Sequence, residues 1–144
     1  MQLRTEIEIA ADPARVWDTL VGFASYPDWN PWVRSVEGEL AVGSVLTLTV
    51  TPADGSERRE RVTVTALEPG RSLRWTGKLV ARFLFAGEHY FELTELGVGR
   101  TRLTQGENLS GAMVQHLGQR LTGMARGFVG MNEALKKRLE RASD

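Results

Sequence analysis

Two residues of this 144-residue sequence carry side chains that together could move a proton. His89 lies on a segment that alternates polar and apolar residues, and Glu107 lies on the next such segment, beyond a turn at residues 97–99. If the segments pair as antiparallel strands across that turn, His89 stands opposite Glu107 and Gln105 falls on the same face. A carboxylate beside an imidazole orients the ring and favours its protonated form, which prepares a general acid or base. The spacing therefore names His89 and Glu107 as candidate catalytic residues.

The same residues also fit a structural role. A polar cluster that joins two strands, or a group that orients a bound ligand by hydrogen bonds, needs the same geometry. Gln105 adds an amide to this cluster and is a candidate ligand-binding residue. Both interpretations stay open at the level of the sequence.

Composition excludes several other chemistries. The chain has no cysteine, which removes disulfides, thiolate nucleophiles and cysteine-ligated metals. It has two histidines, and the second, His116, has no carboxylate or histidine at ligand spacing, so we expect no metal site. No serine lies in the Gly-x-Ser-x-Gly pattern of acyl-transfer enzymes, and no phosphate-binding glycine loop is present. We therefore expect no cofactor.

The charge balance limits the partners. Eighteen basic residues offset eighteen acidic ones, which disfavours nucleic acid and anionic membrane surfaces as partners. No stretch approaches about 18 consecutive apolar residues, and the first residues lack a signal-peptide pattern. We expect a single cytoplasmic domain spanning residues 1–144, with a small hydrophobic molecule as partner, no membrane insertion, and a homodimer left open.

The candidate residues need a sheet to bring them together, and the pattern predicts one. Period-two alternation favours a strand at residues 2–10, and Asp12-Pro13 begins a short helix that ends near Gly22. An aromatic segment at 25–32 predicts a short helical turn. Further strands are expected at about 33–40, 44–51, 58–68, 72–79, 82–95 and 100–109. In this reading the charged run at residues 57–61 is a solvated edge.

A tight turn at residues 68–71 fixes a second register. It would set Val64 opposite Trp75 and Ala66 opposite Leu73, so that one face is apolar throughout. Trp75 would then lie near glycines on the same face, where the missing side chains leave open volume. This arrangement predicts a cavity wall.

After Ser110 an apolar stripe predicts one amphipathic helix of about 30 residues. The stripe consists of Met113, Leu117, Leu121, Met124, Phe128, Met131, Leu135 and Leu139. Four glycines inside the helix, at 118, 123, 127 and 130, each cost about 0.8–1.0 kcal/mol relative to alanine. They indicate either close packing against the sheet or room for a ligand.

These patterns together predict a site for a small apolar molecule. Tryptophan and other large apolar side chains commonly line such sites, although each also fits plain core packing. The candidate ligand-binding residues are Tyr26, Trp29, Trp32, Trp75, Phe91, Gln105, Met113, Leu117, Leu121 and Met124.

Three local sequences make the chain resemble a known superfamily. They are the aromatic turn Tyr26-Pro27-Asp28-Trp29-Asn30-Pro31-Trp32, the strand start Gly87-Glu88-His89, and the helical stretch from Phe128 to Leu139. With the order of elements, they resemble the START and birch-pollen-allergen-like superfamily (SRPBCC), and within it the polyketide cyclase/dehydrase-like family. The resemblance implies an α+β helix-grip fold: two short helices after strand 1, and a seven-stranded curved antiparallel sheet around a long C-terminal helix, with a cavity between them.

Three classes of function fit this expectation, because a fold does not settle function. The first is binding or carriage of a small aromatic, polyketide-like or lipid-like molecule in the cavity. The second is a cyclase, dehydratase or hydrolase in which His89, activated by Glu107, abstracts a proton from such a molecule. The third is a co-chaperone-like interaction module, which would expose an apolar patch in place of a cavity.

Overall fold

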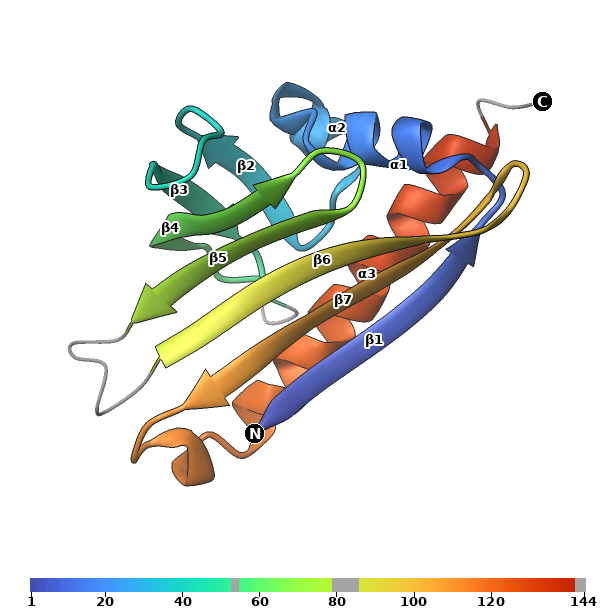
Figure 1. Cartoon of the computed structure of the whole chain (residues 1–144). Helices are drawn as coiled ribbons and strands as arrows, with labels where there is room; N and C mark the ends of the chain where they lie inside the picture. The colour runs from blue at the N-terminus through green and yellow to red at the C-terminus, as the bar shows by residue number, and fades with distance from the viewer. Residues whose placement is uncertain (53–54, 79–85, 142–144) are drawn as a thin grey trace.

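The computed structural model describes residues 1–52, 55–78 and 86–141, and it confirms the predicted α+β helix-grip fold (Figure 1). One seven-stranded antiparallel sheet has the order β1-β7-β6-β5-β4-β3-β2. The elements are β1 Gln2–Ile9, α1 Pro13–Leu20, η1 Phe23–Ser25, α2 Tyr26–Trp29, β2 Val33–Glu37, β3 Val45–Val50, β4 Arg58–Glu68, β5 Ser72–Lys78, β6 Ala86–Gly97, β7 Arg100–Ser110, η2 Val114–His116 and α3 Gln119–Arg141. The start of the strand expected at 82–95, and residue 79 of the preceding one, lie outside the described residues.

The first helix, α1, begins at the Asp12-Pro13 pair, as the sequence predicts. The Asp12 side chain accepts a hydrogen bond from the backbone N–H of Arg15, and Pro13 occupies the first helical position. Val16, Trp17 and Leu20 are buried on one face of α1. The short helices therefore cover one end of the sheet, beside the last turns of α3 (Figure 1).

The register of the β6–β7 hairpin is confirmed. Leu93 pairs with Leu103, Phe91 with Gln105, and His89 with Glu107. Alternation on both strands fixes this register, because a slip of one residue would turn the apolar side chains away from the core.

The register of β4 and β5 is confirmed only in part. Val64 pairs with Trp75 as predicted, but Ala66 pairs with Arg74, and Leu73 faces Leu67. The ladder shifts between Val64 and Ala66, where β4 has one extra residue. Such a bulge places two residues opposite one, so alternation alone does not reveal it.

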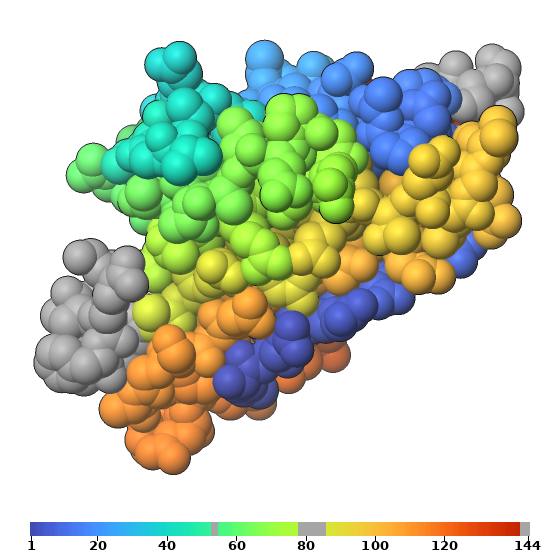
Figure 2. All heavy atoms as spheres, viewed as in Figure 1, coloured from blue at the N-terminus to red at the C-terminus, as the bar shows by residue number. Residues whose placement is uncertain are grey.

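The C-terminal helix is shorter than predicted. α3 has 23 residues in place of about 30, because Gly118 adopts a φ of +45° and the chain before it forms only the short η2 turn. A positive φ is unfavourable for other residues and ends helical geometry at this point. Met113 and Leu117 therefore precede the helix. Figure 2 shows this segment (orange) protruding at the end of the molecule away from α1 and α2.

The core lies between the sheet and the C-terminal half of α3. One face of α3 meets the sheet and carries four buried residues, Phe128, Met131, Leu135 and Leu139. We call the faces of α3 and of the sheet that meet here their interior faces. Figure 1 shows α3 running alongside β1 and β7. One apolar stripe therefore holds the helix against the sheet.

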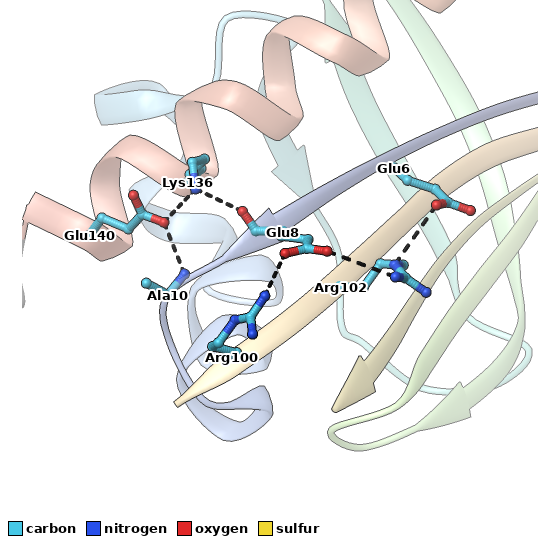
Figure 3. A network of polar contacts seen from close by, with 7 residues as sticks. All are labelled: Glu6, Glu8, Ala10, Arg100, Arg102, Lys136 and Glu140. Atoms are coloured by element: carbon cyan, nitrogen blue, oxygen red, sulfur yellow. Dashed lines mark hydrogen bonds and ion pairs between the residues drawn. The ribbon is translucent and has the colours of Figure 1, made fainter. Parts of the chain in front are cut away.

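Polar contacts fasten the last turns of α3 to the free edge of β1 (Figure 3). Lys136 donates to the backbone carbonyl of Glu8, and Glu140 accepts from the backbone N–H of Ala10. These contacts satisfy edge groups that would otherwise be free to pair with another strand. No helix in the described ranges is long and apolar enough to cross a membrane.

Candidate functional site

His89 and Glu107 face each other on the interior side of the sheet. The His89 Nδ1 atom lies 3.1 Å from Glu107 Oε1, and the two side chains are 8% and 15% exposed. Both side chains point inward because their strands pair in the register described above. The carboxylate and the imidazole therefore form a nearly buried pair.

The second nitrogen of His89 is also occupied. Its Nε2 atom lies 3.0 Å from Oε1 of Gln105, which is fully buried. The Gln105 Nε2 atom donates to the backbone carbonyl of Phe128 at 3.4 Å and to Oδ1 of Asn132 at 2.6 Å. A carbonyl only accepts, so the amide of Gln105 must present its oxygen to His89. The His89 Nε2 atom therefore carries a proton.

The proton on His89 Nε2 limits how His89 Nδ1 can contact Glu107. With Nε2 protonated, a neutral His89 would turn the lone pair of Nδ1 toward a carboxylate oxygen, and the two would repel. The 3.1 Å contact between Nδ1 and Glu107 Oε1 is a hydrogen bond only when a proton lies between these two atoms.

Glu107 presents the free atom of the pair. Its Oε2 atom has no hydrogen-bond partner within the described residues and lies over Gly87, 2.6 Å from where a Cβ would stand. Gly87 is one of the glycines near Trp75 that were expected to leave open volume, and this carboxylate fills the space beside it. Both nitrogens of His89 have partners, so within the described residues Glu107 Oε2 is the polar atom of the pair without one.

Aromatic rings hold His89 in this orientation. The indole of Trp75 stacks on the imidazole at 5.5 Å between ring centres and 16° between planes. Phe91 and Phe128 each meet the same imidazole edge-on at 4.8 Å. Trp32 contacts Phe128 edge-on at 6.2 Å. The histidine therefore sits in an aromatic enclosure that fixes its ring.

The helix face above this cluster is closed on one side and open on the other. A Cβ on Gly127 would lie 2.3 Å from Cε3 of Trp32, whereas a Cβ on Gly123 would have no atom of the described residues within 4 Å. Leu121 and Met124, on the first turns of α3, are half-buried although the same stripe is buried from Phe128 onward. We call the region at Gly123, Leu121 and Met124 the open end.

The remaining predicted ligand-binding residues lie away from the pair. Tyr26 is fully buried, packs edge-on against Trp29, and donates its hydroxyl proton to the carbonyl of Leu20. Burial raises the pKa of Tyr26. Trp29 lines a shallow surface cleft of about 480 Å³ beside residues 134–141, at least about 15 Å along α3 from Met124.

Two predicted residues lie on the segment before α3. Met113 is 38% exposed and Leu117 is half-buried. Their positions follow from the late start of the helix at Gln119, since the apolar spacing of residues 113–121 is not carried by one continuous helix.

Sequence reasoning missed three polar residues. Asn132 and Thr5 continue the hydrogen-bonded chain from Gln105, and Asn132 was overlooked because it neighbours Met131 in an apolar stripe. Glu60 has the same strand parity as the buried Val62 and so lies on the interior face of β4. Parity along the strand was the signal that could have found it.

Glu60 is electrostatically linked to the pair. Partial burial raises the pKa of Glu60 and Arg58 opposes this change; of the pair, Glu107 adds to the increase and His89 opposes it. Its side chain is 45% exposed.

Within the described ranges, no three His, Asp or Glu side chains are grouped so as to hold a metal ion.

A curled antiparallel sheet closed on a long C-terminal helix, with polar groups facing inward, defines a helix-grip protein. The chain belongs to the polyketide cyclase/dehydrase and lipid transport family, whose sequence profile matches residues 1–143. No curated protein sequence matches the chain.

Solved structures show the same fold at low sequence identity. The Zhui aromatase/cyclase from Streptomyces sp. R1128 is 19% identical with a TM-score of 0.79, covering 100% of this chain and 96% of that one. A START superfamily protein from Mycobacterium smegmatis is 20% identical with a TM-score of 0.74, covering 98% of each chain. Ara h 8.0201 is 15% identical with a TM-score of 0.71 and the same coverage. At these identities the likeness concerns the fold.

Proposed function

We propose that this protein binds a small, largely apolar molecule at the open end, between the sheet and the first turns of α3. The observation that carries the proposal is the change along one helix stripe. Its apolar residues are buried from Phe128 onward but half-buried at Leu121 and Met124, beside the unfilled space at Gly123. An apolar surface left partly uncovered beside open space gains free energy when an apolar molecule covers it.

The polar groups limit what the ligand can be. Leu121 and Met124 supply apolar walls, and the free Oε2 of Glu107 offers one hydrogen-bond acceptor. Few polar groups in an apolar site usually fix the orientation of the ligand. The ligand expected here is a flat apolar molecule with a hydroxyl group at one end.

Native mass spectrometry of freshly purified protein tests for a co-purifying molecule of this kind. Binding is then measured by titrating tryptophan fluorescence with 1-naphthol, and with naphthalene as the probe that lacks the hydroxyl. We expect 1-naphthol to bind more tightly than naphthalene, and Glu107→Leu to remove that difference.

A filled open end should block binding. Gly123→Leu places a side chain in the unfilled space, so we expect at least about a tenfold loss of 1-naphthol affinity, or about 1.4 kcal/mol. Gly130→Ala is the matched control, because its Cβ would make only an ordinary contact with Pro31. Unchanged affinity in folded Gly123→Leu would contradict the proposed site.

An acid–base enzyme is the second candidate, favoured by the 3.1 Å contact between His89 Nδ1 and Glu107 Oε1. In that case Glu107 Oε2 accepts a proton from the bound molecule, and the imidazolium of His89 stabilises the carboxylate. Glu107→Gln should then abolish turnover of a confirmed substrate while leaving 1-naphthol binding within a few-fold. Turnover that survives Glu107→Gln would exclude this role.

A further inference from the structure

We infer that Asn132 is a positioning residue that keeps a proton on the Nε2 nitrogen of His89. Asn132 does not contact the open end but acts through the amide of Gln105. The inference rests on the proposed function, in that the His89–Glu107 pair is the polar part of the proposed site. It adds a residue on α3 that sets the protonation of a side chain on β6.

Placing Asn132 in the buried face of a helix costs free energy, and the hydrogen bonds of its side chain offset this cost. It is 2% exposed on an apolar helix stripe, and asparagine is among the poorer helix formers. Its Oδ1 accepts from Gln105 Nε2 at 2.6 Å, and its Nδ2 donates to Thr5 Oγ1 at 2.8 Å. A leucine would fit the stripe without these polar groups, so the amide itself is what this position supplies.

Thr5 on β1 fixes the orientation of the Asn132 amide. The Thr5 hydroxyl donates its one proton to the backbone carbonyl of Gln105 at 2.7 Å. Its oxygen can then only accept from Asn132, so Nδ2 of Asn132 must face Thr5 and Oδ1 must face Gln105. A backbone carbonyl, whose role as acceptor is fixed, thus sets the direction of the whole chain of bonds.

Asn132 in turn prevents the Gln105 amide from turning over. In the reversed orientation, Gln105 Oε1 would face Oδ1 of Asn132 and the carbonyl of Phe128, leaving two acceptor pairs without a proton. Reversal would also present an N–H to His89 Nε2, which would then have to be unprotonated. Without Asn132, only the longer 3.4 Å bond to Phe128 opposes the reversal.

Imidazole ¹⁵N NMR of ligand-free protein labelled at histidine reads this assignment directly. The chain has two histidines, and the exposed His116 serves as an internal reference. In the wild type we expect the His89 Nε2 resonance to lie in the range of a protonated ring nitrogen. A wild-type Nε2 in the range of an unprotonated nitrogen would overturn the inference.

Variants separate positioning from packing. Asn132→Leu should move the His89 Nε2 resonance toward the unprotonated range, whereas Asn132→Asp, which keeps an acceptor facing Gln105, should keep the wild-type pattern. Met131→Leu is the matched control for core packing and should also leave His89 unchanged. Folded Asn132→Leu with wild-type His89 resonances would overturn the inference.

Circular dichroism shows whether Asn132→Leu folds. If it does not, a variant at Thr5, the partner of the Asn132 side chain on β1, tests the inference instead. Thr5→Val frees the Asn132 amide and should cause a smaller shift in the same direction, whereas unchanged His89 resonances would overturn the inference. Because these spectra are recorded without ligand, they stand whether or not 1-naphthol binds. A failure of the proposed function is therefore distinct from a failure of this inference.

Discussion

Gly123 and Gly127 lie about one turn apart on α3 and meet opposite surroundings. A Cβ at Gly127 would collide with the indole of Trp32, while a Cβ at Gly123 would enter open space. Gly127 is thus required for the close contact with Trp32, and Gly123 is not required for packing. The two glycines look equivalent in the sequence, but only Gly127 is needed for the helix to pack closely against Trp32.

Alanine substitutions should separate these two reasons. Gly123→Ala should raise the free energy of unfolding by up to about 1 kcal/mol, since alanine favours the helix and meets nothing. Gly127→Ala should lower it by about 1–3 kcal/mol, because the rigid Trp32 ring must move. Urea unfolding followed by circular dichroism measures both. Effects of the same sign would show that the helix lies differently against Trp32.

At the scale of elements, α3 completes the free edge of β1. The Lys136 and Glu140 side chains, 2.6 Å apart, reach the backbone carbonyl of Glu8 and the backbone N–H of Ala10 (Figure 3). The hydrogen bonds from Lys136 and from Ala10 lower the pKa of Glu140. One helical turn therefore takes the place of a neighbouring strand at this edge.

The lowered pKa of Glu140 gives a signed pH dependence. Its stabilisation is present above the unfolded-state pKa of about 4.3 and is lost as the pH falls through the lower folded-state pKa. Glu140→Gln should therefore cost about 0.5–1 kcal/mol at neutral pH and little in acid.

Urea unfolding at neutral and acidic pH measures this difference. Glu133→Gln is the control, because Glu133 is an exposed carboxylate on the same helix, and it should have no comparable effect. A Glu140→Gln cost that is the same at both pH values would show that the charge of Glu140 contributes nothing.

At the scale of the whole molecule, the two ends of the fold differ. The end with α1, α2 and the last turns of α3 is a packed core in which Tyr26, Leu135 and Leu139 are buried. The end with Gly118 and Leu121 is built from a short turn and a half-buried helix start. Helix α3 is thus more deeply buried toward its C-terminal end than over its first turns.

Hydrogen exchange should report this asymmetry. Backbone amides of residues 128–139 should exchange more slowly than those of residues 121–127, because the latter have fewer buried contacts. Adding 1-naphthol should slow exchange mainly in residues 121–127. Equal protection along α3 would contradict the open end, and ligand protection confined to residues 128–139 would place binding elsewhere.

How much of the fold and of the candidate site could be predicted from the sequence differs from residue to residue. The pairing of His89 with Glu107 followed from period-two alternation and a short turn, both local properties of the chain. The bulge between Val64 and Ala66 and the helix break at Gly118 were missed, because neither interrupts the apolar pattern. The cytoplasmic location stays a prediction, and a homodimer stays a possibility that the sequence leaves open.

The sequence by itself determined the helix-grip fold, the pairing of His89 with Glu107 and the apolar stripe of α3. The tertiary structure decided that both nitrogens of His89 are occupied, that Glu107 presents the free oxygen, and that Asn132 belongs to the same network. The physical reason is that hydrogen-bond direction depends on partners from three separate elements, β1, β7 and α3. Periodicity places each residue on a face, but only packing brings these faces together.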